Sequence, residues 1–581
     1  GQVPTPSIEP WKEATITLDS LPILSEVPGS EYQLKVSLIL KHKTAWADKG
    51  HEVAWKQFSL GSTPATVLDP DGVVDMQESD VAFEIKGKDF SVVLNKASGR
   101  ITSLAYHGRE ILSDSQGPLP NLYRAAGDND GYASGQWRGA GLDDLRHTAT
   151  SVRQTAQAKN YRQFTVDYVS EGKGGFQVES SCAYTFFSDG SVAIDTVISP
   201  NQDKLVLPRA GMRLFANPKF ERLTYYGRGP SENYVDRKTG QAIGRYQTTA
   251  TEMYVDYAKP QFMGSRSDVH WTSLADDDGN GFVVTSETPI SFSAMHVTDE
   301  GLTGVRHPHE IPTRKDIVLT IDAAETGIGG GSCGPSCLTE YRVHGTQHLR
   351  FMIRPITAGV DPSEAARQRA KLGGTLTVSR DNAGNLSFHP TKSGSLFNFA
   401  IDGQKQVSDD GFNLVNGGVV IASVNAAETE IPGVQIKRVF AKQVDKSKWT
   451  ATASSIQSGE GEVNHAIDNN PDTFWHTKWQ GGVDPPPHTL KIDFGSPQPL
   501  AGISVLPRQD SANGRIIRYE LSASEDGVQW QQVAAGVMQN TDRRQDIRFT
   551  KKQDVRAIEL KVLSGQAGDF ATVAEIGILE K

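Results

Sequence analysis

The stretch Tyr226-Gly-Arg-Gly-Pro-Ser-Glu-Asn-Tyr-Val-Asp-Arg237 is the most distinctive part of the sequence. Two further segments follow it in order, Lys259-Pro-Gln-Phe-Met-Gly-Ser-Arg266 and Gly327-Ile-Gly-Gly-Gly331. Around them, apolar residues recur at alternate positions, as in Phe90-Ser-Val-Val-Leu94 and Ser191-Val-Ala-Ile-Asp-Thr-Val-Ile198. Such alternation predicts half-buried strands, and glycine and proline punctuate the chain at the short intervals typical of β-sandwiches. The sequence therefore predicts a mainly β fold.

Length and charge narrow the possibilities further. The chain has 581 residues, more than the ~250 to 300 at which a single core stops growing, so three or four domains are expected. Acidic residues outnumber basic ones by 69 to 59, a net charge of −10. A nucleic acid or an anionic membrane therefore finds no net attraction, and a neutral partner fits better. No run of about 18 uninterrupted apolar residues is present to span a bilayer.

The N-terminus and the cysteines carry less information. The sequence opens at Gly1 with neither an initiator methionine nor a signal peptide, which is typical of a processed fragment whose targeting information is missing. Three cysteines are too few for a disulfide framework in a chain of this size. Cys333 and Cys337 either form a bridge or stay as two packed thiols.

The three distinctive segments, taken with Asp268, Trp271 and Asp322, resemble a signature of the family 2 β-galactosidases. The matching region lies outside the catalytic domain of that family. The resemblance implies a large supersandwich of galactose-mutarotase type at residues 80–360, after a polar linker at residues 66–79. Residues 1–65 are similar to the latter part of the immunoglobulin-like sandwich that follows the barrel. Residues 373–445 have the pattern of a small immunoglobulin-like spacer domain.

Residues 447–581 resemble a discoidin or coagulation-factor type C domain, a jelly roll that shares its architecture with family 32 carbohydrate-binding modules. The matching segments are Ala451-Thr-Ala-Ser454, Ala466-Ile-Asp-Asn-Asn-Pro-Asp-Thr-Phe-Trp-His476, Leu490-Lys-Ile-Asp-Phe-Gly495, Leu506-Pro-Arg508, Tyr519-Glu-Leu-Ser-Ala-Ser-Glu-Asp-Gly527 and Ala574-Glu575. Their order across the whole segment predicts a further β-sandwich, which gives a multi-domain chain of β-sandwiches.

Catalytic carboxylates are not expected in this chain. A retaining glycosidase needs two carboxyl groups about 5 to 5.5 Å apart, and both glutamates of family 2 lie on a (β/α)8 barrel. Nothing in the sequence alternates strand and helix as a barrel must. Asp128-Asn-Asp130 and Asp69-Pro-Asp71-Gly72 are interpreted as solvated turns rather than carboxylate dyads. The resemblance thus implies a parent that is a retaining β-galactosidase, with the catalytic barrel as a partner of this chain.

The resemblance implies that two segments of the large domain form a rim of the neighbouring active site. The first comprises Asp128, Asn129, Asp130 and Gly131, where a glycine would let a loop reach positive φ; the alternative is an ordinary surface turn. The second comprises Ser332 and Cys333, at a place where related enzymes carry a tryptophan that stacks on the sugar.

Other polar residues of the large domain favour structural roles. Asn233, Asp236, Arg237 and Arg266 are candidate sugar ligands, but a buried Arg–Asp pair that fixes loop geometry is favoured. The stretch His307-Pro-His-Glu310 suggests a metal site only weakly, because a third or fourth ligand at a defined spacing is lacking, and a surface turn is preferred.

The C-terminal domain offers a candidate metal site by resemblance. In discoidin-like domains the matching loop binds a structural Ca²⁺ through carbonyls and side-chain oxygens. The residues in those positions are Ala466 and Asn470, through their carbonyls, and Asp468, Thr473 and Glu575, through their side chains. Hard oxygen ligands suit calcium, so a structural Ca²⁺ is the expected cofactor. From composition alone, the loop is an Asn- and Asp-rich turn.

The same domain offers a candidate sugar site. Sugar binding needs an aromatic surface with a few donors and acceptors, and loops of this fold converge at one end. The candidate residues there are His476, Trp479, Arg508, Asn513 and Phe570. Trp475 is expected in the core. The alternatives are ordinary loop residues, or the phospholipid and protein binding that the same fold also supports.

Two hypotheses of different classes follow. In the first, the chain is the noncatalytic C-terminal portion of a bacterial family 2 β-galactosidase, and it contributes the active-site rim and binds a galactoside or another neutral glycan. In the second, it is a free-standing glycan-binding protein built from galactosidase-like sandwiches. Because a glycan-binding module is most useful outside the cytoplasm, a periplasmic or cell-surface location is expected.

Overall fold

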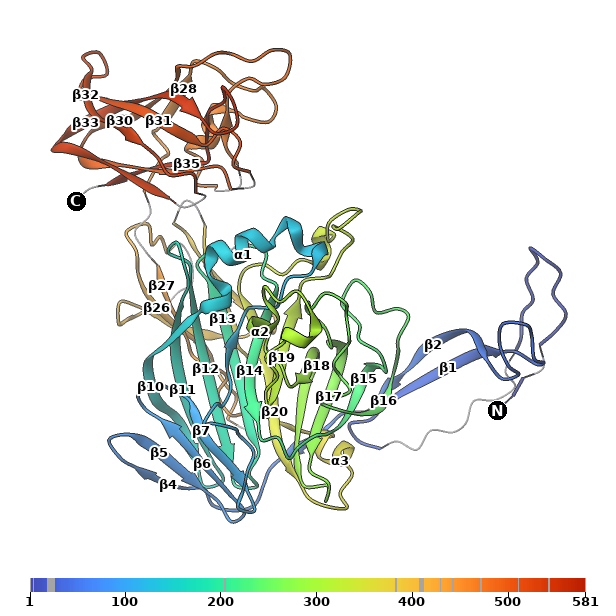
Figure 1. Cartoon of the computed structure of the whole chain (residues 1–581). Helices are drawn as coiled ribbons and strands as arrows, with labels where there is room; N and C mark the ends of the chain where they lie inside the picture. Colours follow the sequence, from blue (N-terminus) through green and yellow to red (C-terminus); the bar gives the residue numbers. More distant parts are fainter. Residues whose placement is uncertain are drawn as a thin grey trace. The chain divides into compact units, whose positions relative to one another are not determined.

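The computed structural model describes residues 2–3, 5–17, 27–202, 205–381, 384–406, 412–428, 430–440, 444–470, 473–509, 511–541 and 544–579. Strands dominate throughout (Figure 1), and the predicted mainly β, multi-sandwich fold is confirmed. The chain divides into two compact units, Gly1–Asp69 with Ser363–Ala370 and Pro70–Pro362 with Lys371–Lys581. No helix among the described residues is long and apolar enough to cross a membrane.

The first unit is built on an antiparallel pair of strands, β1 (Glu31–Ile39) and β2 (Glu52–Ser62), in which Leu34 lies opposite Phe58. A short strand β3 (Thr66–Leu68) pairs in parallel with β21 (Gln368–Ala370). Apolar side chains on β1 and β2, among them Val36 and Leu38, stay exposed. A two-stranded sheet has no second layer to cover them.

Two local expectations are corrected here. The segment 66–79 is not a plain linker, because it contains β3 and β4 (Asp75–Glu78). Leu68 is buried where β3 meets β21, which gives this short strand a reason to form. The sequence from Pro362 to Leu372 predicts a short helix, but the helix α3 (Pro362–Ala366) ends earlier, because the chain turns into β21 directly after it.

The second unit contains the large domain, whose main sheet has 12 strands among the described residues. Their order is β10-β11-β12-β13-β20-β18-β17-β15-β16, and β14 pairs with both β19 and β9 while β19 also pairs with β18. The strands are β9 (Leu119–Asn121), β10 (Arg146–Ala158), β11 (Tyr161–Glu171), β12 (Gln177–Phe187), β13 (Val192–Pro200), β14 (Arg209–Ala216), β15 (Arg222–Gly229), β16 (Ala242–Thr249), β17 (Arg266–Ala275), β18 (Gly281–Met295), β19 (Ile317–Glu325) and β20 (Gln347–Ile356).

A five-stranded sheet packs on this main sheet. It consists of β4, β5 (Ala82–Lys86), β6 (Phe90–Asn95), β7 (Ile101–Tyr106) and β8 (Arg109–Glu110) in that order. Alternate residues of β6 are buried, as the sequence pattern predicts. The ring of Phe83 on β5 lies 4.7 Å from that of Phe164 on β11, within one apolar core.

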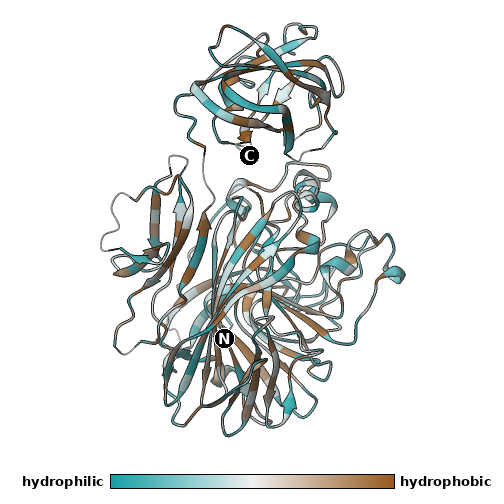
Figure 2. Cartoon of the chain, turned by 90° about the vertical axis from the view of Figure 1, so that its left-hand side faces the viewer, coloured by the Kyte–Doolittle hydropathy of each residue, from teal (hydrophilic) through white to brown (hydrophobic). Residues whose placement is uncertain are grey.

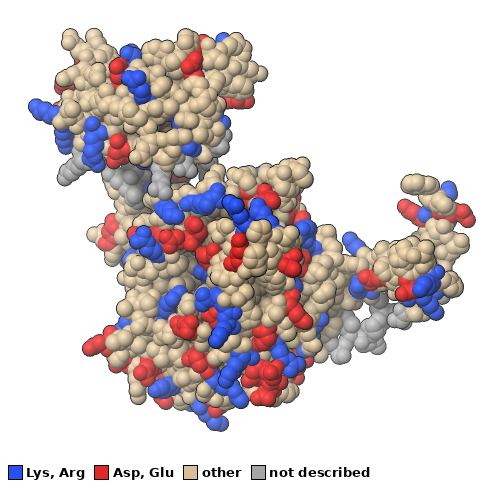
Figure 3. Space-filling view, in the orientation of Figure 1, with Lys and Arg blue, Asp and Glu red and all other residues tan. Residues whose placement is uncertain are grey.

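On the visible surface, Lys and Arg are interspersed with Asp and Glu (Figure 3).

Short helices lie in the connections of the large domain. A 3-10 turn η1 (Asp128–Tyr132) leads into α1 (Ser134–Ala140), whose Trp137 is buried and donates its indole N–H to the Val206 carbonyl at 2.8 Å. The remaining ones are η2 (Leu142–Asp144), α2 (Asp299–Leu302), η3 (Pro308–Glu310) and η4 (Thr339–Tyr341). Sequence alternation gave no signal for α1, because the helix has only two buried residues.

The small domain is a sandwich of two sheets, β22–β23 and β25-β24-β26-β27. Its strands are β22 (Leu376–Arg380), β23 (Leu386–Pro390), β24 (Phe397–Ile401), β25 (Gln404–Lys405), β26 (Gly418–Val424) and β27 (Ile436–Phe440). Its core continues into the large domain, because Ala183 of β12 and Val197 of β13 pack within the same apolar cluster.

The C-terminal domain has a six-stranded sheet in the order β28-β30-β33-β31-β32, with β35 paired to β30, and a second sheet of β29 and β34. Its elements are β28 (Thr450–Ala453), η5 (Val463–Ala466), β29 (Trp475–His476), β30 (His488–Leu506), β31 (Ile516–Ser524), β32 (Gln531–Val537), β33 (Gln545–Gly565), β34 (Thr572–Val573) and β35 (Glu575–Leu579). Apolar and polar residues alternate along the strands (Figure 2). Trp475 is fully buried, as predicted.

The large domain buries one guanidinium among three carboxyl groups. Arg209 lies 2.9 Å from Asp299, 2.7 Å from Glu325 and 3.4 Å from Asp322, between guanidinium nitrogen and carboxyl oxygen. One cation cannot neutralise three buried anions. Burial raises the pKa of Asp322 well above its usual value; Arg209 opposes this shift, and Glu325 and Asp299 add to it. In the folded protein, Asp322 therefore retains its proton at pH values at which an exposed aspartate would be ionised.

This proton makes the stability of the large domain depend on pH. The contribution of Asp322 is complete below the ordinary aspartate pKa of about 4 and is lost as pH rises through the raised pKa of the folded state. Asp322→Asn keeps the shape and cannot ionise, so its midpoint of thermal unfolding should fall less steeply with rising pH than that of the unaltered protein. Asp278→Asn, at an exposed turn, should retain the original slope. An unchanged slope in Asp322→Asn would contradict the assignment.

Candidate functional site

One cavity of the C-terminal domain, of about 280 Å³, collects the five residues predicted as sugar ligands, His476, Trp479, Arg508, Asn513 and Phe570. Glu460 and Phe474 also line it. The sequence interpretation missed these two. Phe474 lies two residues before His476. Residues at this spacing lie on the same side of an extended segment, and this pattern could have identified Phe474 as a lining residue.

Short pairings at one end of the domain position the lining residues. His476 lies in β29, which pairs with β34, and Phe570 lies two residues before β34. Arg508 follows β30, and Asn513 precedes β31. The bridge between Arg515 and Thr572 ties these loops together. The loops therefore converge, as the resemblance implied.

Aromatic rings fix the two basic side chains of the cavity. The Arg508 guanidinium lies 4.1 Å from the centroid of the Phe474 ring. His476 lies between two rings, with centroids 6.2 Å from Phe474 and 5.6 Å from Phe570. Its Nδ1 is 2.5 Å from the Thr477 carbonyl oxygen, so Nδ1 carries the hydrogen in that contact. Cation–π contact and burial leave both side chains little rotational freedom.

Two further groups give the cavity its apolar surface and an acceptor. Trp479 is 43% exposed, and its loop is held by Gln457, whose Oε1 accepts hydrogen bonds from the backbone N–H groups of Trp479 and Gln480 at 3.0 and 2.9 Å. The Oδ1 of Asn513 is buried and has no hydrogen-bond partner among the described residues. A buried acceptor without a partner is costly unless a ligand or water satisfies it.

The residues predicted for calcium come together only in part. Asp468 accepts hydrogen bonds from the Asn470 N–H at 2.8 Å and from the Thr473 hydroxyl at 2.7 Å. The Thr473 hydroxyl also lies 3.0 Å from the Asn470 carbonyl. Glu575 is instead paired with Lys446, with 2.6 Å between Oε2 and Nζ. Burial raises the pKa of Glu575 to about 7, although Lys446 opposes the shift.

Asp468 and Thr473 are therefore bonded to each other, and Lys446 engages one oxygen of Glu575, whereas Glu575 Oε1 is buried and has no hydrogen-bond partner among the described residues. Ala466 is buried in η5. Within the described residues no three His, Cys, Asp or Glu side chains form a group suited to a metal. Calcium binding at this loop stays a prediction. At the other weak metal candidate, Glu310 accepts from the N–H groups of Arg306 and His307, which makes it part of the surface turn that the sequence favoured.

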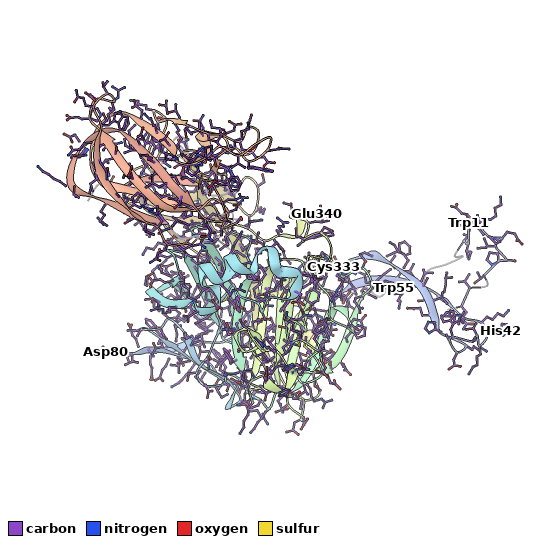
Figure 4. All side chains as sticks on the ribbon, turned by 45° about the horizontal axis from the view of Figure 1, so that its top comes forward. Trp11, His42, Trp55, Asp80, Cys333 and Glu340 are labelled. Carbon is purple, nitrogen blue, oxygen red and sulfur yellow. The ribbon has the colours of Figure 1, made fainter. Side chains whose placement is uncertain are left out.

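The two predicted rim segments of the large domain are in direct contact. Asn129 donates from Nδ2 to the Gly329 carbonyl at 3.0 Å and accepts from the Ser332 N–H at 3.0 Å. Cys333 is exposed on the same loop, which also carries Glu340 (Figure 4). All three cysteines are free, so Cys333 and Cys337 are not bridged.

A buried ion pair and a half-buried carboxylate hold this pair of loops. The Arg124 guanidinium is fully buried and donates to Asp130 Oδ1 at 2.7 Å, to the Gly327 carbonyl at 3.3 Å and to the Thr326 carbonyl. Asp236 accepts from the backbone N–H of Gly329 at 2.7 Å. Gly329 has φ of +66°, and an added Cβ would come within 2.5 Å of the Cys337 backbone, so a glycine is required there.

Two expectations for this region need correction. The favoured Arg–Asp pair does not involve Arg237 or Arg266: Arg237 pairs with Glu232, and Arg266 donates to the Pro230 carbonyl at 3.0 Å. Asp236 fixes loop geometry through backbone N–H groups instead. Asn233 is also structural, since its Oδ1 accepts from the Ser267 N–H. Gly131 lies in η1 without a positive φ and with open space around it, so this conformation makes no use of a glycine there.

Family models match most of this architecture. Residues 86–354 match the model described as beta galactosidase small chain, residues 1–61 match domain 4 of beta-galactosidase, and residues 450–576 match the F5/8 type C domain. Together with the fold, these matches define a chain of β-domains of the kinds found in β-galactosidases. More closely, residues 1–61 and 86–354 are similar to two domains of β-galactosidase, and an F5/8 type C domain follows them.

Curated relatives agree with the family models. A β-galactosidase of Halalkalibacterium halodurans is 31% identical over 358 residues, which cover 60% of this chain and 34% of that protein. A β-galactosidase of Priestia megaterium is 28% identical over 307 residues, which cover 52% of this chain and 29% of that protein. The chain thus spans about a third of the length of the curated relatives it matches.

Two solved structures to which part of this chain is similar are family 32 carbohydrate-binding modules. One, from a Clostridium perfringens family 89 glycoside hydrolase and in complex with GalNAc-β-1,3-galactose, is 30% identical, with a TM-score of 0.22 and coverage of 23% of this chain and 96% of that chain. Another, from C. perfringens NanJ in complex with galactose, is 33% identical, with a TM-score of 0.22 and coverage of 23% and 94%.

The Arg124 contacts lead to a prediction about the rim loops. Arg124→Met leaves Asp130 buried without a cation, a change that typically costs about 3 to 5 kcal/mol. Amide hydrogen exchange should therefore accelerate in residues 127–133 and 326–333. Arg138→Met on the exposed face of α1 is the matched control and should leave these amides unchanged. Equal exchange in both variants would show that Arg124 does not hold the loops.

Proposed function

We propose that this chain is the noncatalytic, glycan-binding region of a β-galactosidase, and that its C-terminal domain binds a galactose-type or amino-sugar glycan. The observation that carries the proposal is the cavity in which Trp479 and Phe570 stand beside Arg508, His476 and Asn513. An apolar ring face packs against the C–H side of a pyranose. The guanidinium supplies donors, and the buried Asn513 oxygen supplies an acceptor for a sugar hydroxyl.

The large domain would serve the parent enzyme through its rim loops. The contacts of Asn129 with Gly329 and Ser332 make the two loops one surface unit. A unit fixed by buried charges is suited to line an active site supplied by another domain, because its shape is set before a substrate binds. The parent would hydrolyse terminal β-galactosides by double displacement on its own barrel. A module that holds glycan favours a periplasmic or cell-surface location for that parent.

The competing hypothesis is a free-standing glycan-binding protein. The extensive match to β-galactosidase domains favours the first hypothesis. The coding sequence upstream of this chain separates the two. The first requires a barrel with two catalytic glutamates there, and the second requires an unrelated or absent reading frame.

Glycan binding can be tested by titrating galactose and N-acetylgalactosamine into the full chain after a glycan-array screen. An open site buries little area, so a dissociation constant in the millimolar to high micromolar range is expected, roughly −4 to −6 kcal/mol. Arg508→Ala and His476→Ala should remove most binding and leave the fold intact. Arg518→Ala, on the exposed side of β31, should bind as the unaltered chain does. Binding that survives both cavity substitutions, or that requires anionic lipid, would overturn the assignment.

The chain by itself should not hydrolyse a β-galactoside, because no catalytic pair of carboxylates is expected in it. A nitrophenyl β-galactoside assay on highly purified protein checks this. Turnover that persists at constant specific activity through repeated purification, and that disappears when a residue of this chain is substituted, would contradict the prediction.

A further inference from the structure

The cation at the predicted calcium loop is a lysine of the chain itself. Glu575 begins β35, and its side chain is only 5% exposed. A carboxylate removed from water needs a counter-charge close by. The Nζ of Lys446, itself only 6% exposed, lies 2.6 Å from Glu575 Oε2. This single contact joins residues 129 positions apart, from before β28 to β35.

Packing holds the lysine in place. Its Nζ lies 5.3 Å from the centroid of the Trp449 ring. That ring in turn packs edge-on against Phe494, with centroids 4.6 Å apart. Trp449 and Phe494 both belong to the apolar core of the domain. An ammonium confined between an aromatic ring and a carboxylate is part of the folded core, not a surface charge that moves away freely.

Two cations of the chain already face the Glu575 carboxylate. Lys446 and Arg544 both act electrostatically on Glu575, while Asp468 also acts on Lys446 and Asp546 on Arg544. Ca²⁺ takes six to eight oxygens at about 2.3 to 2.6 Å. Here Lys446 holds one Glu575 oxygen, and Asp468 and Thr473 bond to each other.

We propose that the Lys446 ammonium takes the role of a bound cation at Glu575, so that the C-terminal domain keeps its first and last segments joined without calcium. Ammonium and calcium would compete for the same carboxylate, because two cations held at contact distance on one carboxylate repel each other. Removal of the lysine charge should therefore turn a metal-independent domain into one that calcium stabilises. This inference does not depend on glycan binding.

The test compares the full chain with Lys446→Met, each treated with EDTA and then dialysed with or without millimolar calcium. Bound calcium is measured by elemental analysis, and protection of β28 and β35 by amide hydrogen exchange. The unaltered chain should hold no calcium and show the same protection in both buffers. Lys446→Met should lose protection without calcium, regain it with calcium and bind the ion at least about tenfold more tightly than the unaltered chain.

Two controls keep the result decisive. Lys448→Met removes an exposed lysine two residues away and should behave as the unaltered chain. If Lys446→Met fails to fold in either buffer, Lys446→Arg, which keeps the cation, should fold and stay independent of calcium. The proposal is overturned if the unaltered chain retains one calcium ion and loses protection with EDTA. It is equally overturned if Lys446→Met is fully protected without metal, or if Lys446→Arg requires calcium.

Discussion

The packing of the large unit depends on the hydrogen-bond and charge partners of one buried carboxylate, that of Asp195. This residue lies in β13, a strand that is covered on both faces. Every residue of β13 is buried. Ile194 faces the core shared with the five-stranded sheet, whereas Val197 packs in the core of the small domain. Asp195 lies on the latter face and accepts from Arg350 at 2.8 Å, from the Thr375 hydroxyl at 3.0 Å and from the Val434 N–H at 3.0 Å. Burial acts to raise the pKa of Asp195, but Arg350 and His348 outweigh it and hold that pKa well below its usual value. The small domain thus supplies part of the shell without which this strand could not be buried, so it is more than a spacer.

Buried charges in this chain are compensated in three different ways at Arg209, Arg124 and Lys446. Around Arg209, three carboxyl groups face one cation, and a retained proton on Asp322 reduces the excess of negative charge. At Arg124, one cation meets one carboxylate and two carbonyls, and no retained proton is needed to fix the loop. At Lys446, one ammonium pairs with one buried carboxylate, that of Glu575, which the resemblance assigned to a calcium site. Because a buried charge is tolerated only with its partners, each arrangement specifies a local geometry more than it adds to overall stability.

The sequence predicted the parts of this structure that depend on local patterns. Alternation identified strands such as β6, and ordered motifs identified both major domains. It also located five residues around the cavity, because loops in this fold meet at one end. Contacts between distant charged residues could not be predicted, since nothing in the segment Asp445–Lys448 indicates that Glu575 lies beside it. The same reason explains why Asp236 was matched with an arginine rather than with backbone N–H groups.

The two candidate sites are held by different means, and this difference bears on what each can do. The rim loops contact each other through backbone groups and buried charges, so their shape is determined within the large domain. Such a surface can complete another site but offers few side chains of its own for recognition. The cavity differs because it presents side chains for recognition. Aromatic rings hold the Arg508 guanidinium and the His476 imidazole in place, and the acceptor Asn513 Oδ1 has no hydrogen-bond partner among the described residues. Groups held rigidly and left unsatisfied are those that a ligand can pair with at little entropic cost. The proposed recognition of glycan therefore falls to the C-terminal domain, and the proposed contribution of the large domain is shape.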